Sequence, residues 1–201
     1  MGNWSKLEVI MAWNDWSIIS VKNILNPVYL QQPIPWERGK LDYVGPGLVE
    51  HTPEESQVNG SLARYNFPYF KHLHYDLKNK LEVILGEPLF PTYYYDRFYF
   101  KGNELSKHKD RPACEVSISV HCSTNLDYDW PIWFTDYEGN DIPLITKPGD
   151  GVIYKGCDLV HWRDPMKGNH KSYYHQIFFH FVRRNGPHVE HAYDNSATKQ
   201  Y

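Results

Sequence analysis

The sequence has few cysteines, and none of them lies in a pattern that binds zinc or builds a disulfide scaffold. Its three cysteines, Cys114, Cys122 and Cys157, are an odd number without a Cys-x-x-Cys pair, which argues against both kinds of site. The start of the chain also lacks an apolar run of signal-peptide length. We therefore expect a reducing, cytoplasmic setting and no attachment to a membrane.

Positive charge is not in excess either. Lys and Arg number 21 against 24 Asp and Glu, the formal net charge is −3, and the basic residues are scattered along the chain. Binding to nucleic acid needs a basic patch that neutralises phosphates. We therefore expect no nucleic-acid partner, which leaves a small-molecule or peptide substrate. The composition does not indicate an oligomeric state.

Aromatic residues, in contrast, are abundant: they make up 16% of the chain, with 16 Tyr and 7 Trp. Such side chains are favoured in β-strands and fill thick β cores. At 201 residues the chain is long enough for one sizeable core and short for two domains. We expect a single domain over residues 1–201 that is mainly β with a flanking helix.

Residues 1–90 form the N-terminal extension of this domain. Two apolar runs, residues 7–13 and 16–21, flank Asn14-Asp15 and predict a hairpin. Residues 31–66 are rich in Pro, Gly and polar side chains, so we expect a long irregular segment, either a binding loop or a poorly ordered stretch. Residues 68–86 carry apolar side chains at three- and four-residue steps, which predicts one long amphipathic helix that supports a sheet, with His72 and His74 at its surface or boundary.

Residues 91–187 consist of short apolar or alternating runs separated by turn residues, with no helical period between them. The runs cover residues 93–99, 116–120, 130–134, 142–145, 152–154, 159–162 and 173–182. This pattern is typical of an antiparallel barrel or jelly roll. We expect this segment to be the core of the domain and residues 188–201 to be a polar tail.

One pair of residues in this core has the spacing of metal ligands. His108 and Asp110 are two positions apart, so on an extended segment their side chains point the same way. His161 lies about fifty residues later, near the end of another strand, and in a jelly roll it can face the same cavity. Two imidazoles and one carboxylate form the facial triad of non-haem Fe(II) oxygenases, which leaves coordination positions open.

The sequence around these residues resembles the Fe(II)/2-oxoglutarate-dependent dioxygenases, in particular their prolyl-4-hydroxylase-like branch. Residues 99–110 match that family's Tyr-x-x-Gly-x-x-(aromatic or Leu)-x-x-His-x-Asp block, and residues 148–154 with His161 match its Gly-Asp strand and distal histidine. The resemblance covers about residues 91–187. It implies a double-stranded β-helix (jelly roll), Fe(II) bound by His108, Asp110 and His161, 2-oxoglutarate as cosubstrate, O2 as co-reactant and ascorbate as a candidate reductant.

The same resemblance implies a cation for the far carboxylate of 2-oxoglutarate. Relatives place an Arg or Lys about nine to eleven positions after the distal histidine, and Lys171 lies ten positions after His161. Arg163 is an equal candidate because it shares the inward face of His161, although it could instead pair with Asp164 at the surface. Tyr99 and Gln176 are expected to add hydrogen bonds to this carboxylate.

The expected activity is hydroxylation of an unactivated C–H bond, with release of succinate and CO2. The substrate is a prolyl or other residue of a peptide, or a small amino-acid-like molecule. Two alternatives stay open: the same chemistry on a lipid, sugar or natural product, and a jelly-roll binding module without catalysis. The remaining histidines of the core, His121, His175 and His180, are expected to be buried structural residues rather than ligands, and no catalytic role is expected for Cys114.

Overall fold

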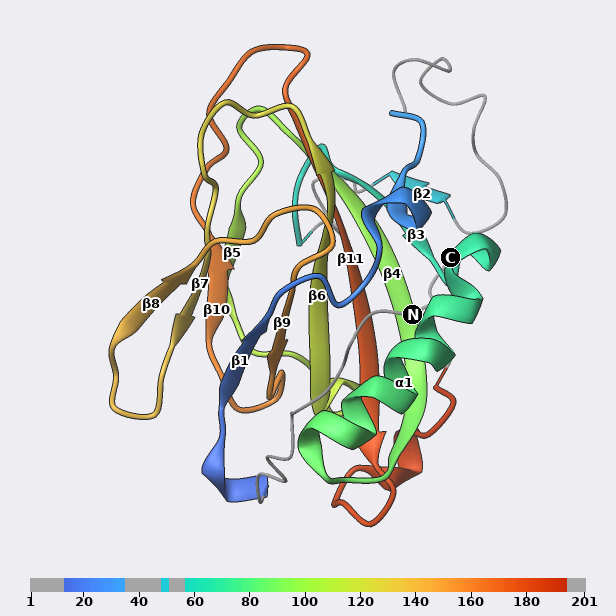
Figure 1. Cartoon of the computed structure of the whole chain (residues 1–201). Helices are drawn as coiled ribbons and strands as arrows, with labels where there is room; N and C mark the ends of the chain where they lie inside the picture. The colour runs from blue at the N-terminus through green and yellow to red at the C-terminus, as the bar shows by residue number, and fades with distance from the viewer. Residues whose placement is uncertain (1–12, 35–47, 51–56, 195–201) are drawn as a thin grey trace.

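The computed structural model describes residues 13–34, 48–50 and 57–194, and its strands form two antiparallel sheets with one α-helix on the outside (Figure 1). The seven-stranded sheet has the order β1-β9-β6-β11-β4-β3-β2, and the four-stranded sheet has the order β5-β10-β7-β8. The strands are β1 (Ile18–Val21), β2 (Leu48–Glu50), β3 (Leu62–Tyr65), β4 (Leu89–Phe100), β5 (Leu105–His108), β6 (Val116–Thr124), β7 (Ile132–Thr135), β8 (Asp141–Leu144), β9 (Gly151–Tyr154), β10 (His161–Arg163) and β11 (Tyr173–Arg183). The predicted mainly β jelly roll with a flanking helix is confirmed.

The predicted helix is also confirmed, as α1 (Lys71–Leu85), preceded by a 3₁₀ helix at Pro68–Phe70. Its leucines at positions 73, 77, 81 and 85 are buried, because this spacing puts them on one face of the helix. Gly86 ends the helix with φ of 65°, and its N–H bonds the carbonyl of Glu82, a termination that glycine makes without steric cost. The buried face of α1 packs on one side of the seven-stranded sheet.

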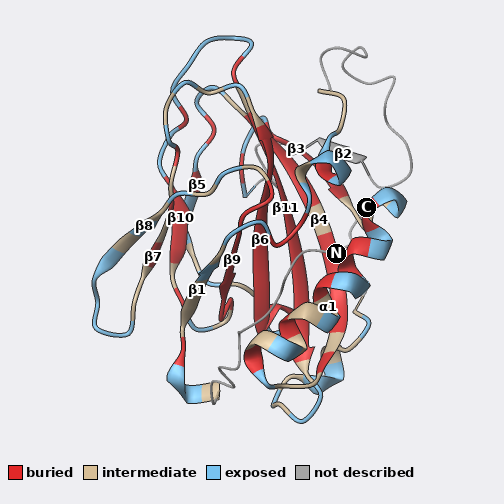
Figure 2. Ribbon diagram, in the orientation of Figure 1, coloured by how far each residue is buried: buried red, intermediate tan, exposed pale blue. Residues whose placement is uncertain are grey.

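Alternation along β11 divides the interior into two layers. Ile177, Phe179 and Phe181 belong to the apolar cluster that includes the α1 leucines, so the intervening residues, Gln176 and Phe178 among them, face the opposite way. The same rule places Tyr95, Arg97 and Tyr99 of β4 on the inner side. Figure 2 shows the central strands buried along most of their length, whereas the β7–β8 hairpin is largely accessible. Arg97, Tyr99 and Gln176 therefore face the space between the two sheets.

Three expectations for the N-terminal half need correction. The turn predicted at Asn14-Asp15 is a 3₁₀ helix (Trp13–Asp15), and β1 pairs with β9; residues 7–12 of the expected hairpin lie outside the described residues. The segment 31–66 is not irregular throughout, because β2 and β3 lie within it and β3 pairs with β4. These pairings join residues that are far apart in the sequence, so no local pattern predicts them.

His74 of α1 is the third correction, because it is buried rather than at the surface. Its Nε2 donates to the carbonyl oxygen of His180 at 3.0 Å, and its ring packs among those of Tyr94, Phe179 and Phe181. His72 is exposed, as expected.

The remaining 3₁₀ helices of the described residues are Pro27–Leu30, Pro112–Cys114 and Val189–His191, the last in the predicted polar tail. Within the described ranges, no helix combines the length and the apolar character that crossing a bilayer requires.

Candidate functional site

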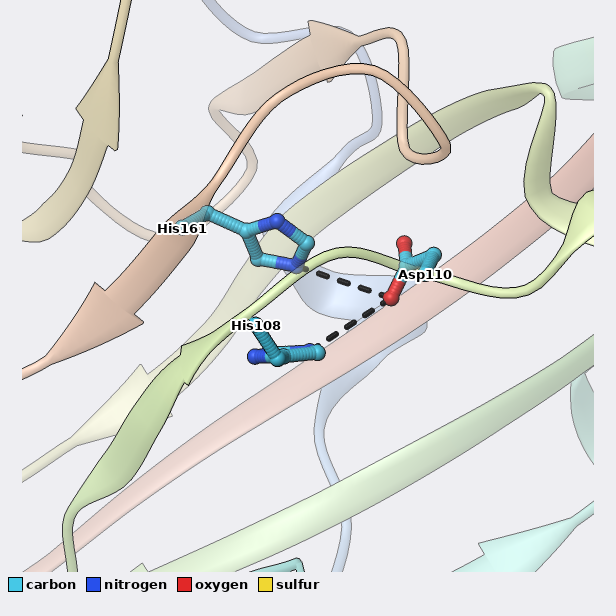
Figure 3. Close-up of side chains that lie close together, drawn as sticks. All are labelled: His108, Asp110 and His161. Carbon is cyan, nitrogen blue, oxygen red and sulfur yellow. Dashed lines mark ion pairs between the residues drawn. The ribbon is translucent and has the colours of Figure 1, made fainter.

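Strand pairing brings His108, Asp110 and His161 together between the two sheets. His108 is the last residue of β5 and His161 is the first of β10, and these two residues are paired neighbours in the four-stranded sheet. Asp110 lies just beyond β5, where its backbone N–H bonds the carbonyl of Gly156 at 2.9 Å. Figure 3 shows the two imidazoles turned towards the carboxylate from adjacent segments. One ligand atom from each residue lies within 4.8 Å of the other two.

Backbone carbonyls fix which nitrogen of each imidazole can bind a metal. His108 Nδ1 lies 2.9 Å from the carbonyl oxygen of Ser106, and His161 Nδ1 lies 3.1 Å from that of Leu159. A carbonyl oxygen only accepts, so each Nδ1 carries the proton and each Nε2 keeps its lone pair. The Nε2 atoms lie 3.5 and 3.6 Å from Oδ1 of Asp110. Neighbouring ligands of an octahedral ion are about 3 Å apart at ordinary bond lengths, so these atoms fit around one cation.

The electrostatics of the site favour the metal-binding forms of its residues. Burial lowers the pKa of His161, and neighbouring His108 lowers it further, against the opposing influence of Asp110. Burial alone would raise the pKa of the Asp110 carboxyl, but its interactions with His161 and His108 outweigh burial and hold the pKa below its usual value. A neutral imidazole and an ionised carboxylate are the forms that bind a cation.

The triad is accessible from one side only. The side chain of His161 is 2% exposed, whereas those of His108 and Asp110 are 22% and 15% exposed. Phe134 and Tyr154, both fully buried, pack beside the His161 ring. A bound ion would therefore meet an apolar wall on one side and keep open coordination positions on the other.

A second group of potential ligands shares Asp110. Cys114 and His180 each place one ligand atom within 4.8 Å of a carboxylate oxygen of Asp110. Burial and the negative charge of Asp110 raise the pKa of the Cys114 thiol well above its usual value, so this sulfur stays protonated and is a poor ligand. The structure therefore favours the set His108, Asp110 and His161, which has the donors of a non-haem Fe(II) site.

Arg163 lies inside the protein, not at the surface, so the alternative ion pair with exposed Asp164 is wrong. Its guanidinium donates to the carbonyl of Trp130 at 2.7 Å and to Oε1 of Gln176 at 2.7 Å. It lies between two rings, 4.6 Å from the centre of Trp130 and 4.7 Å from that of Tyr174. No carboxylate of the described residues pairs with it, and its Nε is buried without a hydrogen-bond partner there. A buried cation without a counter-ion is costly, so this site favours an anion.

The other three residues predicted around the cosubstrate fall into different positions. Gln176 is buried beside Arg163, and its amide nitrogen donates to Ser119 Oγ. Tyr99 is fully buried against Trp130, and its hydroxyl has no partner by hydrogen-bond geometry among the described residues. Lys171 is exposed in the loop before β11. The structure thus brings Arg163, Gln176 and Tyr99 into the interior and leaves Lys171 outside it.

A buried guanidinium opposite Gln176 was given no role in the sequence analysis. Arg97 is 1% exposed, lies opposite Gln176 in the β4–β11 pairing, and bonds Oε1 of Gln57. The alternation of Arg97 with Tyr95 and Tyr99 could have drawn attention to it, because charged residues are rarely buried on the inward face of a strand unless they are paired. Two surface cavities, of about 410 and 370 Å³, contain no residue of the triad.

Comparison with solved structures identifies the fold. The chain is similar to a Pseudomonas putida prolyl-4-hydroxylase (TM-score 0.60, 13% identity, 83% of this chain and 93% of that chain). It is also similar to a Trichoplax adhaerens prolyl hydroxylase in complex with a hypoxia inducible factor peptide (0.59, 12%, 84% and 84%) and to the non-heme alpha ketoglutarate dependent epimerase SnoN from nogalamycin biosynthesis (0.60, 10%, 81% and 77%).

No protein-family model and no curated protein matches the sequence. The fold is therefore that of the 2-oxoglutarate/Fe(II) oxygenases, and the resemblance read from residues 91–187 is confirmed at the level of fold. Within that fold, the predicted ligands lie together at one end of the four-stranded sheet.

Proposed function

We propose that the protein is an Fe(II)- and 2-oxoglutarate-dependent dioxygenase that hydroxylates an unactivated C–H bond. The observation that carries this proposal is the convergence of two Nε2 atoms and one carboxylate oxygen, with both Nδ1 atoms fixed by backbone carbonyls. A structural zinc site would have a closed set of ligands, usually with thiolates. This donor set leaves open positions, which catalysis at a metal requires.

The bound iron and 2-oxoglutarate would supply the oxidising chemistry, in which one atom of O2 enters succinate, CO2 is released and the other oxygen atom enters the C–H bond. His108, Asp110 and His161 hold the cation on one side and leave the opposite side for the reactants. Phe134 and Tyr154 exclude water from the closed side of the site. Arg163 binds the far carboxylate of the cosubstrate, with Gln176 and Tyr99 orienting it.

The substrate we propose is a peptidyl residue, prolyl among them, or a small amino-acid-like molecule. Two of the similar structures are prolyl hydroxylases, which supports this class, whereas the similar epimerase belongs to nogalamycin biosynthesis. The fold alone does not select among these substrates. A natural product thus remains the alternative substrate.

The test removes the triad one residue at a time. His108→Ala and Asp110→Ala should each abolish stoichiometric iron binding and the release of succinate on addition of Fe(II), 2-oxoglutarate and ascorbate. Their unfolding curves should show an intact fold. His170→Ala is the matched control, because this histidine is exposed in a loop and should be dispensable. If the triad variants kept full turnover, the proposed function would be wrong. A hydroxylated product would appear as a gain of one oxygen atom by mass spectrometry.

A further inference from the structure

The guanidinium of Arg111 lies at the edge of the candidate metal site and has no part in the function proposed above. Arg111 follows Asp110 directly, and its guanidinium carbon lies 4.4 Å from the centre of the Tyr93 ring. The Tyr93 hydroxyl lies 3.3 Å from Cys114 Sγ, and this sulfur is within 4.8 Å of a carboxylate oxygen of Asp110. Arg111 is therefore three contacts away from the ligand set, through the buried side chains of Tyr93 and Cys114.

One nitrogen of this guanidinium already binds a carboxylate. Nη1 donates to Oδ2 of Asp194, while Nη2 is buried and has no hydrogen-bond partner within the part of the chain that the structure describes. A carboxylate binds a guanidinium best through two parallel N–H···O bonds. The ion pair with Asp194 uses only Nη1. A carboxylate placed to accept from both Nη1 and Nη2 would therefore pair better with Arg111.

Asp194 is held outside the two sheets, and its side chain is 12% exposed. It lies three residues after the 3₁₀ helix Val189–His191 and belongs to none of the sheets. The preceding residue, Tyr193, has φ of 59°, a left-handed conformation that L residues rarely adopt. The Arg111 side chain is 37% exposed, so the ion pair with Asp194 borders solvent although Nη2 is buried.

We propose that Arg111 binds the carboxylate of the substrate, and that Asp194 occupies this position in the absence of substrate. The inference rests on the proposed function and names its substrate class: an amino acid or the C-terminal residue of a peptide, whose carboxylate pairs with Arg111 while a C–H bond faces the metal. Arg163 does not serve this carboxylate, because it is buried between Trp130 and Tyr174. Asp194 thereby stays paired with the guanidinium of Arg111 until substrate binds.

Calorimetric titration of the full chain loaded with Zn(II), which occupies the triad without turnover, tests this proposal. The probes are N-acetyl-L-proline, its neutral primary amide, and L-proline. We expect the acid to bind at least tenfold more tightly than the amide. Asp194→Asn should strengthen binding of the acid about tenfold, the equivalent of about 1.4 kcal/mol, because the internal competitor is lost. Tight binding by N-acetyl-L-proline alone indicates a peptide C-terminus, and equal binding by L-proline indicates a free amino acid.

Variants of the arginine complete the design. Arg111→Gln should abolish the preference for the acid, Arg111→Lys should retain part of it, and Arg184→Gln, an exposed control, should leave it unchanged. Arg111→Lys keeps the test valid if the neutral variant does not fold. If acid and amide bind alike, or if neither binds to wild type or to Asp194→Asn, the proposal is overturned. Failure of the proposed function has a different signature, because it appears as unchanged metal binding in His108→Ala.

Discussion

At the scale of single residues, the backbone decides which atoms of the site are available. Both triad imidazoles have Nδ1 committed to a carbonyl, so their Nε2 atoms face Asp110. The spacing of His108 and Asp110 and the Gly-Asp strand before His161 are local signals, and these three candidate ligands could be predicted. The choice between Arg163 and Lys171 could not, because it depends on the path of the loop after β10, which places Lys171 in solvent.

The role proposed for Arg163 can be measured against that of Lys171. Arg163→Gln should raise the KM for 2-oxoglutarate roughly 100-fold, since losing a buried charged partner of a carboxylate costs about 2–5 kcal/mol. Lys171→Gln should change it less than about twofold, because an exposed ion pair contributes little. Steady-state kinetics with varied 2-oxoglutarate, together with unfolding curves for both variants, makes the comparison. If Lys171→Gln raised this KM and Arg163→Gln did not, Lys171 would be the residue that binds the far carboxylate.

Gly156 is a residue whose importance only the structure reveals. A Cβ at this position would lie 2.5 Å from the carbonyl oxygen of Cys114 and 2.6 Å from Oδ2 of Asp110. Gly156→Ala should therefore displace Asp110 and weaken iron binding at least about tenfold, since misplaced ligands cost that much or more. Gly139→Ala is the control: nothing lies within 4 Å of its Cβ, so its left-handed backbone should lower stability while iron affinity stays at the wild-type value. Equal iron affinity in both variants would contradict this role for Gly156.

At the scale of elements, periodicity within one segment was a better guide than pairing between segments. The leucine spacing of α1 and the alternation of β6 and β11 are local properties, and these elements form as predicted. β3 was missed because it has little pattern of its own; its place is fixed by pairing with β4, Ala63 opposite Arg97. β1 lies within the predicted run 16–21, but its partner β9, more than a hundred residues away, could not be predicted.

The helix α1 offers a direct comparison of its two faces. Leu77 is fully buried and Val83 is 69% exposed. Leu77→Ala should lower the free energy of unfolding by about 2–4 kcal/mol, through lost apolar contact and a cavity. Val83→Ala should change it by less than about 0.5 kcal/mol. Urea unfolding measures both, and iron binding by the folded variants should not differ, because α1 packs on the side of the sheet away from the triad. If Leu77→Ala lowered the free energy of unfolding no more than Val83→Ala does, the face of α1 that carries Leu77 would not be packed.

At the scale of the whole molecule, buried polar groups join the extension to the jelly roll. Asp96 of β4, fully buried, accepts hydrogen bonds from Arg64 of β3 and from His175 of β11. The positive charge of Arg64 outweighs the effect of burial and keeps the pKa of the Asp96 carboxyl below its usual value. Removing one member would leave a buried charge unpaired, so the seven-stranded sheet depends on a residue of the N-terminal half. Sequence reasoning treated these residues separately, because the pairing of three distant strands brings them together.

Two further histidines link the stability of the molecule to pH from opposite faces of this sheet. Burial lowers the pKa of His74, on the helix side, and of His121, on the inner side, to about 4 in each case. In the unfolded chain each would titrate near the usual histidine value of 6.5. Below that pH the unfolded chain binds protons that the folded protein does not. Stability should therefore fall as the pH drops from 6.5 towards 4, by roughly 1–3 kcal/mol for each residue.

His74→Gln isolates one of these contributions, because the amide can still donate to the carbonyl of His180 but does not take up a proton in this range. The free energy of unfolding of this variant should depend less steeply on pH between 6.5 and 4 than that of wild type. His72→Gln, on the exposed face of the same helix, should keep the wild-type slope. Chemical unfolding at several pH values gives the three slopes. An unchanged slope for His74→Gln would mean that the folded protein does not lower the pKa of this ring.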